Sequence, residues 1–261
     1  METNKLRILI NRQVSTRYWH MIVEAPELVN RIDPGQFFNI LCGNTALPFL
    51  RRPFSIYRVN QHEGTIEFLY LVQGVGTIEM TNLKSGELVD LLGPFGVGFH
   101  LEKEWNNLLL LARGVGIATL AALAQEATAQ GKKCIAILSA RSHDDLLATD
   151  VLQSLGADVY KVTEEDGTSD PEQVEQLIER ILQEELIDAG FTCGSKRLSK
   201  LMQKMSDKHS FPAQIALEEH MACAMGACFA CVCNIRDEET IKSVRVCTEG
   251  PVFDLSKVVM S

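Results

Sequence analysis

Four cysteines near the C-terminus limit what this chain can fold into more than any other feature. Cys223, Cys228 and Cys231 are separated by four and then two residues, and Cys247 follows after a gap of fifteen. This spacing is typical of plant-type [2Fe–2S] ligation, in which four thiolates hold two irons. Small residues such as Gly226 lie between the cysteines and let backbone N–H groups turn toward the sulfurs. The segment is therefore predicted to form a tight loop around an iron–sulfur cluster.

A structural zinc site is the alternative that four cysteines leave open. Zinc sites usually space their ligands as two short Cys pairs, whereas here three cysteines share one loop. Cys233 is a spare thiol two residues after Cys231, and exchanging the two would give a less usual spacing. Cys42, Cys134 and Cys193 lie in apolar sequence and are interpreted as small buried hydrophobic residues.

Length and composition describe an ordinary globular protein. With 261 residues, the chain can form two compact domains and a small module. A net charge of −9 argues against nucleic acid and against anionic membrane surfaces as partners. The longest apolar run, 108–112, is far too short to span a membrane. No secretory leader is recognisable and the chain has eight cysteines, so we expect a reducing compartment and a cytoplasmic protein.

Two kinds of hydrophobic pattern divide the chain. Short alternating segments separated by turn residues predict a small β-barrel or sandwich, with strands at 6–10, 18–23, 36–41, 54–59, 65–72 and 88–92. Strands then alternate with helices, which predicts a doubly wound α/β unit with strands at 108–111, 134–139, 158–162, 190–193 and 214–217. The fold class is therefore multi-domain β plus α/β. We place a β-barrel at 1–100, an α/β domain at 101–213 and a cluster module at 214–261.

The middle of the predicted barrel carries residues suited to holding a flavin. Arg52, Pro53, Phe54 and Ser55 open a strand, and such an arginine can grip a pyrophosphate oxygen. The aromatic ring and the hydroxyl can contact the isoalloxazine. The segment 74–77, Gly-Val-Gly-Thr, starts a helix whose free N–H groups suit a phosphate. Alone, the first motif also fits a surface arginine beside a core strand. Its order between the Pro-Gly-Gln-Phe of 34–37 and the Gly-Pro-x-Gly of 93–96 strengthens the flavin interpretation.

With these motifs in this order, the chain resembles the ferredoxin-reductase superfamily. Within it, the chain is similar to the electron-transfer subunits of class 1B dihydroorotate dehydrogenases, the PyrK family, over essentially its whole length. The resemblance implies an FAD-binding barrel, an NAD(P)-binding α/β domain and a [2Fe–2S] domain. It implies that the four cysteines bind the cluster. It also implies three groups of FAD contacts, namely Arg52, Pro53, Phe54 and Ser55, then Leu69, Tyr70 and Leu71, and finally Gly76 and Thr77.

The nicotinamide side departs from the family pattern. Gly114 and Gly116 follow the first α/β strand, where phosphates bind at a helix N-terminus, and tight strand-to-helix packing is the less favoured alternative. The family usually shows another glycine where Arg113 stands, so Arg113 either contacts a phosphate or blocks the pocket. Cys193 and Gly194 resemble the Cys-Gly pair near the nicotinamide, and the alternative is a buried cysteine before a turn glycine.

The choice between NADH and NADPH stays open. Arg141 follows the second α/β strand, where an arginine suits a 2′-phosphate, whereas the nearby Asp144 and Asp145 suit a free ribose. The family resemblance favours NAD(H), without excluding NADP.

The predicted function is electron transfer. A flavin couples two-electron hydride chemistry to the one-electron chemistry of a cluster. We find no acid–base pair or nucleophile triad for a second substrate, so no catalytic residue is assigned. The resemblance implies an FMN-containing dihydroorotate dehydrogenase as catalytic partner, in a heterotetramer that serves pyrimidine biosynthesis.

Other functions remain open from the sequence. They are a paralogue serving a different oxidoreductase, a stand-alone NAD(P)H:acceptor reductase, and a cluster-bearing regulator. The regulator is disfavoured because the acidic chain shows no basic helix for DNA.

Overall fold

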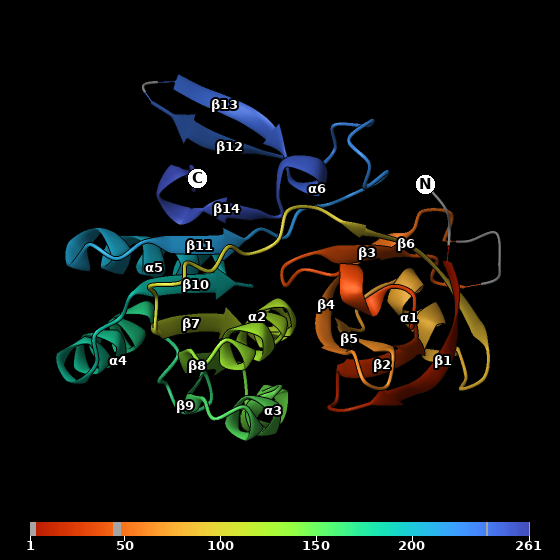
Figure 1. The fold of residues 1–261 in the computed structure, drawn as a ribbon, viewed down its shortest axis with the longest axis horizontal. Coiled ribbons are helices and arrows are strands. Elements are labelled where there is room, and N and C mark those ends of the chain that lie inside the picture. The colour runs from red at the N-terminus through yellow and green to blue at the C-terminus, as the bar shows by residue number, and fades with distance from the viewer. Residues whose placement is uncertain (1–3, 44–47, 239, 261) are drawn as a thin grey trace.

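The computed structural model describes residues 4–43, 48–238 and 240–260 (Figure 1). A barrel and an α/β sheet lie side by side, and the C-terminal segment lies along one edge of both (Figure 1). Among the described residues, no helix is long and apolar enough to cross a membrane.

The N-terminal part is a closed antiparallel barrel in the strand order β1-β2-β5-β4-β3-β6. Its strands are β1 (Asn4–Gln13), β2 (Tyr18–Glu24), β3 (Phe37–Ile40), β4 (Arg52–Asn60), β5 (Thr65–Leu71) and β6 (Leu88–Phe95). The turn η1 (Val29–Arg31) and the helix α1 (Val75–Thr81) connect them. Alternating apolar side chains, including Ile8, Phe38, Ile56 and Phe68, fill the interior. The predicted barrel is confirmed.

The second part is a six-stranded sheet in the order β14-β11-β10-β7-β8-β9. Its parallel strands are β7 (Asn107–Arg113), β8 (Lys133–Ala140), β9 (Asp158–Thr163), β10 (Ala189–Cys193) and β11 (Ala213–Ala216). The connections are η2 (Gly114–Gly116), α2 (Ile117–Ala129), η3 (His143–Asp145), α3 (Thr149–Ser154), α4 (Pro171–Glu184) and α5 (Lys196–His209). Leu108 and Leu110 face α2 and α3, and Leu109 and Leu111 face α4 and α5. Helices on both faces explain why β7 is apolar throughout.

The C-terminal segment is fastened to both larger parts. It contains the hairpin β12 (Val232–Asp237) and β13 (Thr240–Arg245), the short helix α6 (Val246–Glu249), the strand β14 (Val252–Asp254) and the turn η4 (Leu255–Lys257). β14 pairs antiparallel with β11 and so extends the α/β sheet. On the other side Cys231, Val246 and Cys247 pack against Phe37 of the barrel. The domain limits at 100/101 and 213/214 stay a prediction, since β11 and β14 share one sheet.

Candidate functional site

A cleft of about 950 Å³ lies between the barrel and the α/β sheet. This volume is in the range that holds cofactors. Of the predicted cofactor contacts, the residues lining the cleft are Arg52, Pro53, Phe54, Ser55, Leu69, Tyr70, Leu71, Gly76, Thr77, Gly114 and Gly194. Gly116 and Cys193 lie behind its wall. The structure therefore gathers residues from three distant sequence segments around one cavity, and their contacts with a cofactor stay a prediction.

The two consecutive arginines of the flavin motif have different surroundings. Arg51 forms an ion pair with Asp90, 3.0 Å from Nη1 to Oδ1, and donates to the carbonyls of Asn39 and Asp90. Arg52 lines the cleft, and its Nη1 donates to the carbonyls of Leu50 (2.9 Å) and Arg51 (3.1 Å). Arg51 therefore serves the barrel, and Arg52 is the arginine available to an anionic group in the cleft.

Tyr70 and Phe54 form an apolar wall of the cleft. Their rings meet edge to face, with centroids 5.8 Å apart. The Tyr70 hydroxyl donates to Oδ1 of Asn11 at 2.8 Å, which fixes the ring against the barrel core. Burial raises the pKa of Tyr70, so the hydroxyl stays neutral. A flat aromatic ligand would find a rigid, uncharged surface here.

The start of α1 combines an open position with a tight one. A Cβ on Gly74 would meet nothing within 4 Å, whereas one on Gly76 would lie 3.2 Å from Sγ of Cys42 and 3.4 Å from Cγ of Arg52. The Thr77 hydroxyl accepts hydrogen bonds from the backbone N–H groups of Gln73 (3.0 Å) and Gly74 (3.2 Å). The Thr77 side chain therefore caps its own helix in this structure. The first backbone N–H groups of a helix have no partner within it, and residues 74–77 line the cleft.

The nucleotide loop is interlocked with the end of β10. A Cβ on Gly116 would lie 2.7 Å from both the carbonyl carbon and oxygen of Cys193, and one on Gly194 would lie 2.2 Å from the carbonyl oxygen of Arg113. Gly114 and Gly194 have φ of +54° and +92°, a conformation that favours glycine. Gly116 therefore provides close backbone packing, the alternative that the sequence left open, and Gly114 and Gly194 form the surface facing the cleft.

Arg113 is tied to the neighbouring strand ends. Its Nη1 donates to Oγ of Ser139 at 2.7 Å, and its Nη2 forms an ion pair with Glu164. Ser139 lies at the end of β8 and Glu164 follows β9, so the guanidinium lies at the carboxyl ends of the parallel strands. The arginine also borders the cleft, and its choice between the two roles stays a prediction.

Asp145, one of the two acidic residues that follow the second strand, is engaged across the cleft. Asp145 lies 3.6 Å from Nη2 of Arg17 and accepts a hydrogen bond from Ser15 at 3.4 Å. Both partners belong to the barrel turn between β1 and β2. Arg141 also lines the cleft. The structure thus gives Asp145 a role in joining the barrel to the α/β sheet, and the choice of nicotinamide stays a prediction.

Glu218 contributes a carboxylate to the cleft that the sequence did not reveal. It lies open to the cavity, yet surrounding protein raises the pKa of its carboxyl. Its Oε1 is 3.9 Å from Sγ of Cys193, and burial raises the pKa of that thiol well above its usual value. His220 also lines the cleft. No local motif marks these positions, because β11 and the cluster loop bring them there.

The four predicted ligand cysteines approach one another in two pairs. Sγ of Cys223 accepts backbone hydrogen bonds from Met225 (3.5 Å) and Cys228 (3.4 Å), and Sγ of Cys231 accepts one from Cys247 (3.4 Å). Burial raises the pKa of Cys223, but these N–H groups and the Cys228 thiol outweigh it and lower the pKa to about 7. Burial and the Cys231 sulfur raise the pKa of Cys247 to about 11.

This pairing suits two irons with two thiolates each, and N–H groups directed at sulfur stabilise ligated thiolates. Positive φ at Gly226 (+82°) and Ala224 (+56°) turns the loop so that its amides face inward. Among the residues that the structure describes, no three His, Cys, Asp or Glu side chains are grouped to hold a single metal ion.

Comparison with known proteins agrees with this geometry. Residues 218–259 match the iron–sulfur cluster binding domain of dihydroorotate dehydrogenase B. The "Dihydroorotate dehydrogenase B (NAD(+)), electron transfer subunit" of Caldanaerobacter subterraneus subsp. tengcongensis is 36% identical over 98% of both chains. Its namesake from Bacillus cereus (strain B4264) is 31% identical over 100% of both.

Solved structures show the same fold. An NADH-dependent reduced ferredoxin-NADP oxidoreductase covers 99% of this chain, matched over 91% of its own, with a TM-score of 0.83 and 22% identity. Ferredoxin-NADP⁺ reductase from Plasmodium falciparum covers 79%, matched over 91% of its own chain, with a TM-score of 0.64 and 14% identity. The fold and cleft define a protein of the ferredoxin-reductase class. The chain belongs to the family of dihydroorotate dehydrogenase B electron transfer subunits, which confirms the predicted resemblance.

Proposed function

We propose that this chain is an electron-transfer subunit that passes electrons between NAD(H), FAD and a [2Fe–2S] cluster, to or from a catalytic dihydroorotate dehydrogenase. The observation that carries the proposal is the shared cleft. The flavin motif of β4, the nucleotide loop after β7 and the segment leading to the cluster cysteines all line it. The names of the relatives, electron transfer subunits of an NAD(+)-linked enzyme, support the same conclusion.

The barrel side of the cleft fits FAD. Arg52 would neutralise the pyrophosphate beside the first turn of α1, where Gly74 leaves open space. Phe54 and Tyr70 would bound the isoalloxazine, and the Ser55 hydroxyl would reach its polar edge. Bound there, FAD would supply the exchange between hydride and single electrons.

The opposite side fits a dinucleotide. Gly114 exposes backbone at the N-terminal end of η2 and α2, which favours a phosphate. Gly194 lines the cleft beside it, and the neighbouring Cys193 stays a neutral thiol. We place NAD(H) on this side on the basis of the relatives' names alone, with NADP as the alternative.

The cluster ligands are proposed to be Cys223, Cys228, Cys231 and Cys247. The matched domain and the two thiol pairs support this assignment. Cys233 packs against the core that contains Cys231 and Cys247, and burial raises its pKa to about 11.

The proposed partner is an FMN-containing catalytic subunit, joined in a heterotetramer that serves pyrimidine biosynthesis in the cytoplasm. The relatives are named as electron transfer subunits of dihydroorotate dehydrogenase B, which supports a separate catalytic subunit. Affinity purification from the native host would test this. Recovery of a different dehydrogenase would favour the paralogue alternative.

An anaerobic NADH titration, followed by absorbance and low-temperature electron paramagnetic resonance, tests the electron path. Loss of flavin absorbance together with a reduced [2Fe–2S] signal is expected, with about two irons per chain. If dithionite reduces the cluster while neither NADH nor NADPH reduces the flavin, the nucleotide side of the proposal is wrong. About one zinc per chain, with neither iron nor flavin, would establish the structural zinc alternative.

A further inference from the structure

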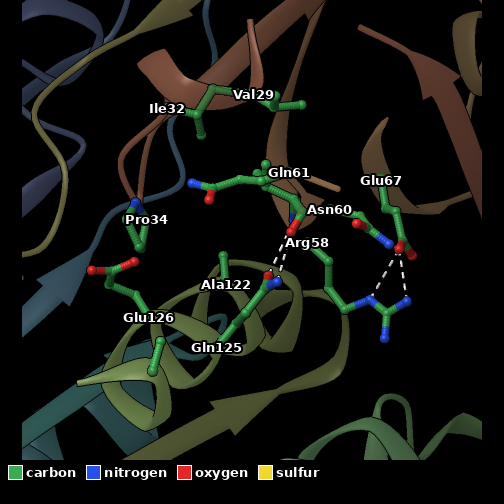
Figure 2. A pocket seen from close by; sticks show the side chains of 12 residues that line it. Val29, Ile32, Pro34, Arg58, Asn60, Gln61, Glu67, Ala122, Gln125 and Glu126 are labelled. Atoms are coloured by element: carbon green, nitrogen blue, oxygen red, sulfur yellow. Dashed lines mark hydrogen bonds and ion pairs between the residues drawn. The ribbon is translucent and has the colours of Figure 1, made fainter. Parts of the chain in front are cut away.

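Gln125 joins α2 to the barrel by two hydrogen bonds, beside the apolar contacts that Tyr18, Tyr57 and Leu69 of the barrel make with the core containing α2. Nε2 of Gln125 donates to the carbonyl oxygen of Val59 at 2.6 Å, and the N–H of Val59 donates to Oε1 of Gln125 at 3.1 Å (Figure 2). Both backbone groups of one residue in β4 are thus bonded by one amide of the α/β domain. The pattern is that of a neighbouring strand, supplied by a side chain.

The edge of β4 is open at this point because β3 is short. β3 pairs with β4 only from Ile40 opposite Arg52 to Phe37 opposite Ser55. A bulge between Ile56 and Arg58 then shifts the register against β5. Backbone groups beyond it need partners other than β3, and Gln125 provides them for Val59. The two hydrogen bonds between Gln125 and Val59, called the clamp below, therefore form because β3 ends early. No local sequence pattern around Gln125 reveals this.

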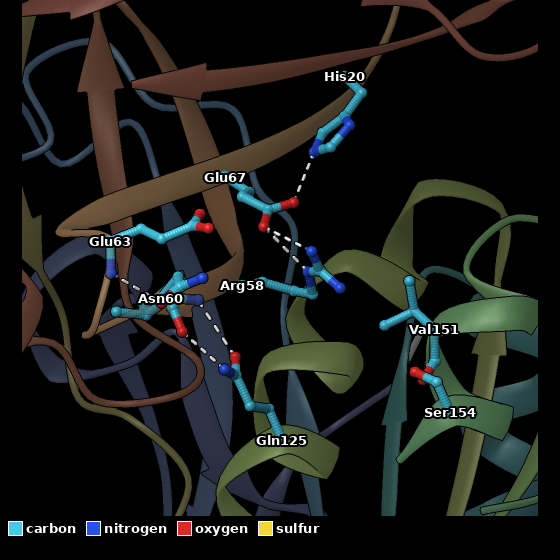
Figure 3. A network of polar contacts seen from close by, with 9 residues as sticks. His20, Arg58, Asn60, Glu63, Glu67, Gln125, Val151 and Ser154 are labelled. Carbon is cyan, nitrogen blue, oxygen red and sulfur yellow. Dashed lines mark hydrogen bonds and ion pairs between the residues drawn. The ribbon is translucent and has the colours of Figure 1, made fainter. Parts of the chain in front are cut away.

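On the side of Gln125, α2 makes few other polar contacts with the barrel. A cavity of about 400 Å³ separates part of α2, at Ala122 and Glu126, from Ile32 and Pro34 of the barrel (Figure 2). The neighbouring ion pair of Arg58 with Glu67 (2.7 Å) lies within the barrel itself (Figure 3). The clamp is thus a contact between the two parts that resists sliding of α2 along β4.

Both elements run from the clamp to the cleft. From Val59 to Ser55, β4 spans about 13 Å, at about 3.3 Å per residue. From Gln125 to Ile117, α2 spans about 12 Å, at about 1.5 Å per residue. The flavin motif on β4 and the nucleotide loop before α2 therefore lie at similar distances from the contact between Gln125 and Val59. A shift of α2 at the clamp would move the nucleotide loop past the flavin motif by a similar distance.

We propose that Gln125 is a positioning residue that sets the alignment of the nicotinamide with the flavin, without touching either. The inference rests on the proposed function, in which hydride passes between these two groups. Hydride transfer needs reacting atoms about 3–3.5 Å apart, and a misplacement of about 1 Å can cost a hundredfold in rate.

The variant Gln125→Met keeps the length of the side chain and removes both hydrogen bonds. Gln130→Met is the matched control, because Gln130 ends the same helix and bonds only to Glu126 within it, at 2.8 Å. The test compares the limiting rate of flavin reduction by NADH in stopped flow, in protein carrying FAD and cluster. Hydrogen exchange of the 56–61 segment gives a readout that does not depend on activity.

For Gln125→Met we expect a rate lower by about tenfold to a hundredfold, full FAD and iron content, and faster exchange at 56–61. Gln130→Met should match the parent protein in all three. If Gln125→Met does not fold, Gln125→Asn, which keeps the amide on a shorter arm, should show the same loss of rate. An unchanged rate in folded Gln125→Met would overturn this inference and leave the proposed function standing. Loss of FAD from that variant would do the same, because Gln125 would then act by stabilising the barrel. Failure of NADH to reduce the parent protein's flavin would overturn the proposed function and this inference together.

Discussion

Adding one methyl group at Gly116 tests how the nucleotide loop is held. Gly116 has φ of −57°, so alanine would meet no backbone strain there. Its new Cβ would instead lie 2.7 Å from the carbonyl carbon and oxygen of Cys193 and from Cα of Gly194. All three are backbone atoms, so no side chain can rotate away.

The size of the effect follows from this overlap. Ordinary Cβ contacts begin at 3.4 Å, so η2 and the end of β10 must separate by 3.4 − 2.7, about 0.7 Å. Overpacking of this kind costs about 1–3 kcal/mol, which for a chain of this size lowers the melting temperature by roughly 2–10 °C. The displaced backbone includes Gly194 at the cleft, so a weaker apparent affinity for NADH is also expected.

Thermal unfolding and steady-state kinetics with NADH measure the two effects. Gly74→Ala is the control for unfolding, because a Cβ there meets nothing within 4 Å and φ of −153° suits alanine. If Gly116→Ala melts with the parent protein and keeps its KM for NADH, the argument that backbone packing holds the loop is wrong.

Three further predictions follow from the site. Cys228→Ser should remove the cluster signal in electron paramagnetic resonance while flavin absorbance persists, because the barrel motif and the cluster loop are separate; joint loss of FAD from a folded protein would contradict the proposed domain division. Arg52→Ala should weaken FAD by about 1.5–3 kcal/mol, or roughly tenfold to a hundredfold in Kd by fluorescence titration, and unchanged affinity would reject its role. Burial would raise the pKa of Glu67, but its bonds to His20 and Arg58 lower it (Figure 3). Stability from Glu67 is therefore present above the usual glutamate pKa and lost as pH falls through its lower folded value, so acid unfolding of Glu67→Gln should show a shallower pH dependence over that window.

The fold was largely predictable because its signals are local. In the barrel strands, the alternation of apolar and polar residues indicates which side chains are buried. The apolar run of β7 likewise indicates a strand that is buried on both faces. β14 was missed, since three residues carry too little pattern, and it forms only because β11 offers an edge. The hairpin of β12 and β13 was also missed, because its mostly exposed residues lack the apolar alternation that marks a half-buried strand.

The site was predictable only where one segment carries a whole function. The cluster spacing and the segment 52–55 are of this kind. Gly114 and Gly116 have the same sequence context, yet one faces the cleft and the other the backbone of Cys193, which only the fold decides. Glu218 and Gln125 act through partners far away in sequence, so no motif could mark them.

Phe37 belongs both to the wall of the cleft and to the small core that holds Cys231 and Cys247. It also pairs with Ser55 of the flavin motif. Under the proposed function, Phe37 thus belongs to the packed wall between the electron donor and its acceptor. Tunnelling through such a fixed wall does not wait for domains to move. Under the proposed function, hydride transfer from NADH to the flavin depends on how the barrel and the α/β domain are aligned. Electron transfer from the flavin to the cluster instead crosses a wall of packed residues.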